Sequence, residues 1–345
     1  MNCKRIGIEL AKNVFQIHGV NARDEVVVKK QLKLNQMIEY FSALPPCNIA
    51  MEACGTAHYW SRTLASLGHH VKLIAPQHVK PYVQRGKNDA NDAAAICEAA
   101  SRPHMKFVAT KNEAAQAMQL VHRARSVTIK ARVALLNEIR STLAEFGIVC
   151  KALGATCTRT TLIDTMRNES RVFPAPLSEL LHLLADRLTN LDAEMERFDL
   201  MLNTHVKTSA VVKRLIAVEG IGPITASAME CAAVDANMFK TGRDFAAWLG
   251  LTPRQNSSGG KTKLSGITKH GDSYLLTLLI QGAQNVVRYC VNKTDERSLW
   301  IQSLLLRRHN NVVAVALANK TARIVWSLLT KGEDYRPPRL ITLEA

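Results

Sequence analysis

Four acidic side chains in the first hundred residues have the spacing of a metal-dependent nuclease site. Glu9 and Glu52 each end a short β-rich run, and Asp89 and Asp92 lie in the run KNDANDAAAI. Because residues three apart share one face of a helix, both aspartates can point at a common target. Carboxylates from two strands and a helix are what two Mg²⁺ ions need to hold the attacking and leaving oxygens of a phosphodiester. Taken singly, Asp89 can instead be a helix N-cap and Glu52 a solvated strand end.

The elements that must position these acids alternate between strands and helices. Three consecutive strands are predicted at 4–10, 13–20 and 25–32, followed by a helix at 35–43. A strand at 48–52, a helix at 57–67, a strand at 70–74 and a helix at 89–100 complete the order βββαβαβα. This order predicts an α/β domain in which helices cover a mixed sheet, as in RNase-H-like nucleases.

A second reactive group is predicted near residue 258. The run LTPRQNSSGGKTKLSGITKHGDSYLLTLL places Ser257 and Ser258 directly before two glycines. Four cations lie close in sequence: Arg254, Lys261, Lys263 and Lys269. A hydroxyl in a small loop among cations can attack a phosphate, and the same loop can bind a phosphate without covalent chemistry. Composition alone leaves both interpretations open.

A glycine turn upstream of these serines predicts contact with a nucleic-acid backbone. Gly220 and Gly222 stand between two short apolar runs in LIAVEGIGPITASAMEC. The pattern resembles a helix-hairpin-helix element, whose turn offers backbone N–H groups to a phosphate. An ordinary tight turn between two helices would have the same glycines.

The middle of the chain carries a heptad repeat. Apolar residues recur in alternating steps of four and three: Leu177, Leu181, Leu184, Leu188, Leu191, Met195, Phe198 and Leu202. We interpret this seam as a coiled coil shared between subunits, the alternative being a helical pair packed within its own chain. A second helix is predicted over 114–146, and the glycines and prolines of 147–176 let the two fold back as an antiparallel hairpin.

The charge distribution favours a nucleic-acid partner. The net charge is +16, and both ends are basic: residues 1–111 carry 15 basic and 8 acidic side chains, 112–212 carry 12 and 11, and 213–345 carry 18 and 10. The eight cysteines include no C-x-x-C pair, which argues against zinc and a disulfide scaffold. Because we find no signal-peptide pattern and no run of about 18 apolar residues, we expect a cytoplasmic protein without a membrane partner.

Several runs resemble one family of insertion-sequence transposases. In chain order they are IGIELAKNVFQIHGV, MEACGTAHYW, KNDANDAAAI, GIGPITA, FAAWLGLTPRQNSSGGKTKLSGITKHGDSYL and ALANKTARIVWSLLTKGEDY. The resemblance is to the IS-one-ten family and its IS-eleven-eleven branch. It implies an RNA-guided recombinase with a RuvC-like DEDD domain, a coiled-coil middle domain and a transposase domain with a serine nucleophile.

The resemblance also assigns roles to residues. The family's RuvC-like tetrad, which binds Mg²⁺, corresponds to Glu9, Glu52, Asp89 and Asp92. Ser258 corresponds to the nucleophilic serine that precedes a glycine. A homodimer that assembles to a tetramer is implied, as is a noncoding bridge RNA that pairs with donor and target DNA. The chain departs from the pattern at Glu9, where Asp is usual, and at Leu276, where arginine is common.

We therefore expect a RuvC-like domain at 1–110, a helical dimerisation domain at 111–208 and a mainly helical transposase domain at 209–345. The expected function is site-specific recombination of donor and target DNA through a phosphoserine intermediate, in the cytoplasm and at the nucleoid. The expected nucleic-acid contacts are Lys12, Lys87, Gly220, Gly222, Arg254, Lys261, Lys263 and Lys269. The alternatives are a RuvC-like junction nuclease that uses metal-activated water, and a non-catalytic nucleic-acid-binding scaffold.

Overall fold

The computed structural model describes residues 3–84, 86, 88–152, 154–168 and 172–339. The chain divides into two compact units. The first unit consists of Met1–Gln116 and Ala233–Met238, and the second of Ala117–Ala232 and Phe239–Ala345. Lys87, a predicted nucleic-acid contact, lies outside the described residues. The helices expected as a middle domain fall in the same unit as most of the C-terminal helices.

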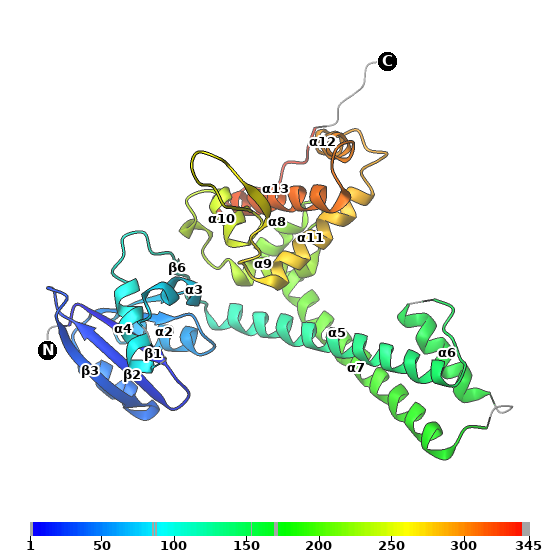
Figure 1. Cartoon of the computed structure of the whole chain (residues 1–345), viewed down its shortest axis with the longest axis horizontal. Coiled ribbons are helices and arrows are strands. Elements are labelled where there is room, and N and C mark those ends of the chain that lie inside the picture. Colours follow the sequence, from blue (N-terminus) through cyan, green and yellow to red (C-terminus); the bar gives the residue numbers. More distant parts are fainter. Residues whose placement is uncertain (1–2, 85, 87, 153, 169–171, 340–345) are drawn as a thin grey trace. The chain divides into compact units, whose positions relative to one another are not determined.

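A six-stranded mixed sheet, ordered β3-β2-β1-β4-β5-β6, forms the first unit (Figure 1). Its strands are β1 (Arg5–Leu10), β2 (Val14–Val20), β3 (Val26–Lys33), β4 (Asn48–Glu52), β5 (His70–Ile74) and β6 (Phe107–Val108). The first three are antiparallel neighbours, β4 and β5 continue the sheet parallel to β1, and β6 is an antiparallel edge. The five predicted strands are confirmed to within one residue at each end, and β6 is an addition.

Helices cover both faces of this sheet. They are α1 (Met37–Ser42), α2 (Ala57–Ser66), α3 (Pro76–Val79) and α4 (Asp89–Ala99), with single turns η1 (Leu34–Gln36) and η2 (Lys80–Tyr82). Because successive side chains of a strand alternate between faces, Ile6 and Ile8 join the core under α1 and α2. Ala50 and Ile74 face the other way and pack with Ile96 of α4. The predicted mixed sheet with helices is confirmed.

The second unit contains a long helical hairpin. Its helices are α5 (Glu113–Glu145), whose first residues belong to the first unit, α6 (Ala155–Arg167) and α7 (Ala175–Thr208). Arg125 pairs with Asp199 at 2.6 Å, and Arg132, further along α5, pairs with the earlier Asp192 of α7. Since the partners run in opposite directions along the two helices, α5 and α7 are antiparallel.

The heptad seam of α7 is buried inside this hairpin. Its leucines from Leu177 to Leu188 form one core with Leu135 and Ile139 of α5 and Leu162 of α6. The interpretation of these leucines as an interface between subunits is therefore wrong. A heptad period shows which face of a helix is buried, but the side chains that bury it can belong to the same chain.

Charge in this seam should destabilise the fold. Leu184 is 4 % exposed, whereas its neighbour Leu183 is 60 % exposed. We expect Leu184→Glu to lower the free energy of unfolding by about 3–5 kcal/mol, because it removes a packed side chain and buries an unpaired carboxylate. In urea denaturation, Leu183→Glu should stay within about 0.5 kcal/mol of the parent. Loss of oligomers with unchanged unfolding of Leu184→Glu would restore the seam as an interface.

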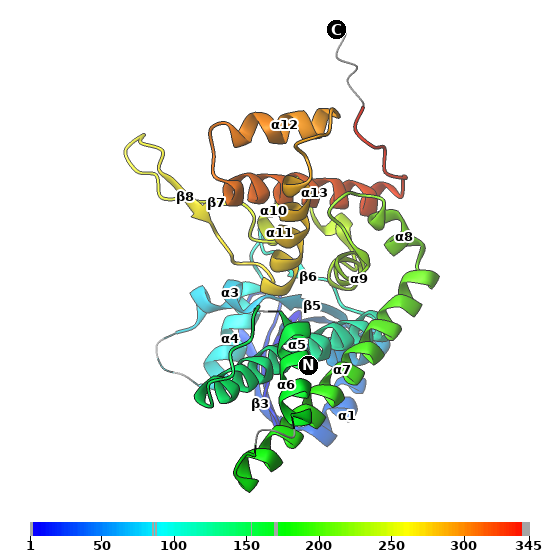
Figure 2. The ribbon, with the colours of Figure 1, turned by 90° about the vertical axis from the view of Figure 1, so that its right-hand side faces the viewer.

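The remaining helices form a bundle in the second unit (Figure 2). They are α8 (Ala210–Ile216), α9 (Pro223–Ala232), α10 (Gly242–Trp248), α11 (Ser273–Arg288), α12 (Glu296–Leu305) and α13 (Asn310–Lys331); η3 (Ala236–Met238) belongs to the first unit. A two-stranded hairpin, β7 (Pro253–Gln255) and β8 (Leu264–Ile267), extends from the bundle. By length and composition α13 could cross a membrane, but its buried Leu317, Ala318 and Val325 make it a core helix of this bundle.

Candidate active site

Two strand ends and a helix start carry the four predicted acids. In the parallel pairing of β1 with β4, Ile8 lies opposite Met51, so Glu9 and Glu52 follow side by side. Along β1, Glu9 shares the face of Gly7, and a Cβ on Gly7 would lie 2.3 Å from the carbonyl oxygen of Ala93 in α4. The glycine thus permits a close approach of α4, which carries Asp89 and Asp92 in its first turn.

The start of α4 is capped without using a member of the tetrad. The side chain of Asn88 accepts a hydrogen bond from the backbone N–H of Ala90 at 2.9 Å. Asn88 is therefore the N-cap, and the interpretation of Asp89 as the N-cap is wrong. The carboxylate of Asp89 is exposed and remains available for a ligand.

The four carboxylates act on one another electrostatically. Burial, followed by repulsion from Glu52, Asp92 and Asp89, raises the pKa of Glu9 to about 7. Burial and the charge of Asp92 also raise the pKa of Glu52. Like charges raise a carboxyl pKa only when they lie close together, so the fold gathers the acids of the sequence pattern into one acidic site.

This acidic site suits a divalent cation. Its donors are carboxylate oxygens, the hard ligands that Mg²⁺ and Mn²⁺ take, and a bound cation would relieve the repulsion among them. Lys12 lies two residues beyond the end of β1 and is exposed, on the edge of the sheet where Glu9 stands. A phosphate at the acids would thus have a cation beside it.

Ser258 lies at the tip of the β7–β8 hairpin. Gly259 and Gly260 have φ values of +56° and +75°, and Lys261 donates its backbone N–H to the carbonyl of Ser258 at 3.0 Å. Two left-handed residues between paired strands are typical of a type I′ turn, for which Gly-Gly is well suited. The sequence predicted only a flexible loop here, and the structure has a defined hairpin.

The hairpin distinguishes the two adjacent serines. The hydroxyl of Ser257 accepts from the backbone N–H of Lys263 at 3.3 Å and from the side-chain amide of Gln255 at 3.0 Å. Within the described part of the chain, no hydrogen bond engages the hydroxyl of Ser258, and the residue is exposed. Ser258 can therefore approach a substrate without breaking the hairpin.

Four cations share this hairpin and its base. Arg254 donates to the carbonyl of Ile267 at 3.4 Å, and the other three are exposed lysines: Lys261, Lys263 and Lys269. The structure thus brings the predicted cations together around Ser258. The serine lies in the second unit and the acidic site in the first.

The glycine turn joins α8 to α9, in the helix-turn-helix order that the sequence suggests. Gly220 has a φ of +88°, which only glycine adopts readily, and it touches Gly282 of α11. A Cβ on Gly222 would meet no atom within 4 Å, so this glycine is not required by packing. Gly220 is therefore structural first, and its contact with nucleic acid stays a prediction.

We expect Gly282→Ala to destabilise the second unit. The added Cβ would lie 1.9 Å from the carbonyl oxygen of Gly220, a backbone atom that cannot rotate away. Overpacking of this kind costs about 1–3 kcal/mol, or several degrees in melting temperature. Gly266→Ala in β8 is the matched control, because its Cβ would meet nothing within 4 Å. Equal melting temperatures for both variants in circular dichroism would contradict the close contact.

Known transposases match nearly the whole chain. Residues 6–148 match the IS110 DEDD type of transposase, and residues 212–298 match the transposase IS116/IS110/IS902 family. A probable family 20 transposase of Pseudomonas aeruginosa is 56 % identical over 98 % of this chain and 100 % of its own length. The transposase for insertion sequence element IS1111A of Coxiella burnetii is 40 % identical, over 96 % of this chain and 91 % of its own. That for IS1328 of Yersinia enterocolitica is 39 % identical, over 97 % and 99 %.

The chain belongs to this transposase family. The DEDD match includes all four acids, and the second match includes both the glycine turn and Ser258. The two candidate halves of the active site therefore lie in the two segments by which the transposase is recognised. The hairpin of α6 and α7 lies largely between these segments.

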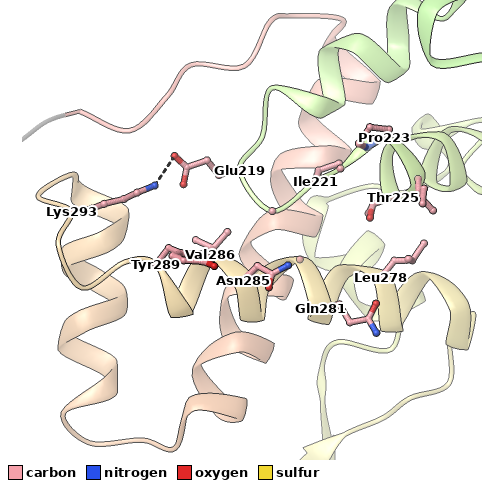
Figure 3. Close-up of a pocket in the computed structure, with 14 residues that line it drawn as sticks. Glu219, Ile221, Pro223, Thr225, Leu278, Gln281, Asn285, Val286, Tyr289 and Lys293 are labelled. Atoms are coloured by element: carbon pink, nitrogen blue, oxygen red, sulfur yellow. Dashed lines mark hydrogen bonds and ion pairs between the residues drawn. The ribbon is translucent and has the colours of Figure 1, made fainter. Parts of the chain in front are cut away.

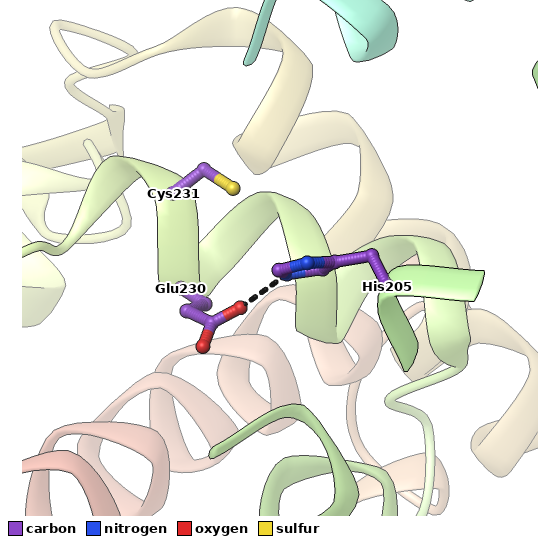
Figure 4. A group of neighbouring side chains, drawn as sticks. All are labelled: His205, Glu230 and Cys231. Carbon is purple, nitrogen blue, oxygen red and sulfur yellow. Dashed lines mark hydrogen bonds and ion pairs between the residues drawn. The ribbon is translucent and has the colours of Figure 1, made fainter. Parts of the chain in front are cut away.

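The transposase has one more cluster that its sequence spacing does not suggest. Among the described residues, His205, Glu230 and Cys231 are the three potential metal ligands whose donor atoms all lie within 4.8 Å of one another (Figure 4). Glu230 accepts hydrogen bonds from His205 and from the hydroxyl of Ser209, each at 2.6 Å. Since both carboxylate oxygens already have partners, the cluster fastens the end of α7 to α9.

Proposed function

We propose that this transposase is a bridge-RNA-guided recombinase that cuts and rejoins donor and target DNA through Ser258. The difference between the adjacent serines carries the proposal, because Ser257 is held within the hairpin and Ser258 is not. The cations around Ser258 supply the second support, since they would hold a phosphate against the hydroxyl.

In the proposed step the Oγ of Ser258 attacks the phosphorus of a phosphodiester. A bond forms between serine and phosphorus as the bond to one deoxyribose oxygen breaks, and that oxygen leaves as a hydroxyl. A carboxylate of the acidic site takes the serine proton. Rejoining reverses the step with the hydroxyl of the exchanged strand, so the phosphoserine preserves the bond and no nucleotide triphosphate is consumed.

Glu9, Glu52, Asp89 and Asp92 would hold Mg²⁺. When bound, the cation stabilises the negative charge that develops on the phosphate oxygens. We propose that the two units act together on one phosphodiester, with the acids from the first and the serine from the second.

Guidance and assembly are further parts of the proposal. A net charge of +16 provides for two polyanions, the bridge RNA and the DNA. With the heptad seam buried in the chain, a homodimer and its tetramer would use other side chains of the helical hairpin, such as the exposed Leu180, Leu183 and Leu200. The assembly would act in the cytoplasm, at the nucleoid.

Glu9 tests whether the acidic site binds a metal. The family pattern has Asp at this position, and the longer glutamate moves its carboxylate by roughly one bond length relative to the tight geometry of Mg²⁺. We therefore expect Glu9→Asp to retain or raise the recombination rate and Glu9→Ala to lose it, measured in a plasmid recombination assay. Full activity of Glu9→Ala would make the residue structural and favour a scaffold whose site has decayed.

RNA sequencing tests guidance most simply. The transposase is purified after expression from its complete insertion element, and the RNA that copurifies is sequenced. We expect one element-encoded noncoding RNA with segments complementary to both donor and target. Bulk cellular RNA in place of such a species would remove the bridge RNA from the proposal.

A further inference from the structure

A groove of about 660 Å³ lies between the glycine turn and α11 (Figure 3). One wall is the turn from Glu219 to Pro223, and the other is α11 and the residues that follow it. The contact between Gly220 and Gly282 holds the two walls together at the floor. The groove is therefore a fixed feature of the second unit.

Three polar side chains line the α11 wall. Gln281, Asn285 and Tyr289 are spaced four residues apart, so they form one stripe along the helix. All three are exposed, and Tyr289 is 68 % exposed. Over the residues that the structure describes, no hydrogen bond or ion pair holds their side chains. The stripe thus offers amide donors and acceptors and one flat ring to a ligand.

The charge at one end of the groove is balanced in favour of an anion. Glu219 would repel a phosphate, but it pairs with Lys293 at 3.5 Å and with Arg297. Arg297 is 6 % exposed and also donates to the hydroxyl of Tyr335. Two cations against one carboxylate leave a net positive charge beside Tyr289, and Lys293 is half exposed and can reach a backbone phosphate.

We propose that this groove binds an unpaired stretch of nucleic acid, with a base stacked on Tyr289 and base edges hydrogen-bonded to Asn285 and Gln281. An exposed ring, amides and a cation in one groove are the combination that proteins use for single strands. A duplex does not satisfy the stripe, because its base faces are already stacked on one another. The inference rests on the proposed function and adds to it, since phosphate contacts by the glycine turn need no aromatic residue.

The test compares single-stranded with double-stranded probes. Binding of a fluorescein-labelled oligothymidylate of about 20 nucleotides and of a duplex of equal length is measured by anisotropy in about 0.15 M salt. Stacking of one base contributes about 1–3 kcal/mol, so Tyr289→Ala should raise the single-strand Kd roughly 5- to 150-fold. The duplex Kd should change less than about twofold, and Tyr289→Phe should bind the single strand like the parent, since its ring remains.

Val291→Ala is the matched control, because Val291 is 69 % exposed two residues away and has no ring. Asn285→Ala provides a second variant, for which we expect weaker single-strand binding at an unchanged melting temperature. An unchanged single-strand Kd for Tyr289→Ala, or an equal loss for the duplex, would overturn the inference. A parent that binds the duplex but no single strand would overturn it and leave the proposed function standing. A parent that binds neither probe would overturn both.

Discussion

Ser258→Ala is expected to abolish recombination and to remove every covalent protein–DNA species. The variant loses only the attacking oxygen, and Ser258 is exposed at a hairpin tip, so the fold should be unchanged. Binding of RNA and DNA should stay within about twofold, because one neutral hydroxyl adds little beside the neighbouring cations. The measurement is strand exchange between donor and target DNA, followed by denaturing electrophoresis of labelled DNA.

Ser257→Ala is the matched control for this variant. Its hydroxyl only accepts hydrogen bonds within the hairpin, so we expect its loss to slow recombination by no more than about tenfold, through a less ordered turn. If Ser258→Ala still cuts DNA in a Mg²⁺-dependent way, water is the nucleophile and the transposase works like a junction nuclease. If Ser257→Ala is the inactive variant, the nucleophile has been assigned to the wrong serine.

The second large effect is expected at the acidic site. Asp92→Ala removes a carboxylate that raises the pKa of both Glu9 and Glu52, and with it a proposed metal ligand. We expect the recombination rate to fall by at least about 10³-fold, the scale of a lost electrostatic group in an active site. The melting temperature without metal should stay equal or rise, because the variant also removes repulsion among the acids.

Glu98→Ala on the same helix is the control for Asp92→Ala. Glu98 pairs with Arg102 at the surface, and such a pair contributes at most about 1 kcal/mol. Its recombination rate should therefore equal that of the parent. Near-normal recombination by Asp92→Ala would overturn the metal-site assignment.

The sheet of the first unit could be predicted because its strands alternate buried and exposed residues. In β1, Ile6 and Ile8 face one core and Glu9 the other side, and such a period of two leaves little choice of register. The convergence of the acids follows from parallel strand ends meeting at one edge of a sheet. What the sequence could not indicate is the close approach of α4 over Gly7, which depends on a contact between distant segments.

Other features of the second unit were beyond the sequence patterns. The seam of α7 predicts a buried face but not its partners, which include Leu162 on the unpredicted α6. That helix is rich in threonine, a weak helix former, and lies between glycines and prolines that indicate a loop. The Ser258 hairpin has a signal, the Gly259-Gly260 pair, but its short strands are exposed and lack apolar alternation. His205 and Glu230 meet only through tertiary packing.

Mapping the covalent bond between transposase and DNA tests the proposed chemistry most directly. The parent protein, loaded with its RNA, is incubated with donor and target DNA, denatured, digested with protease and nuclease, and analysed by tandem mass spectrometry. We expect a nucleotide attached through phosphate to Ser258, in a peptide that is unmodified without DNA. Cut DNA with no nucleotide on any peptide, or a nucleotide on another residue, would contradict a phosphoserine at Ser258.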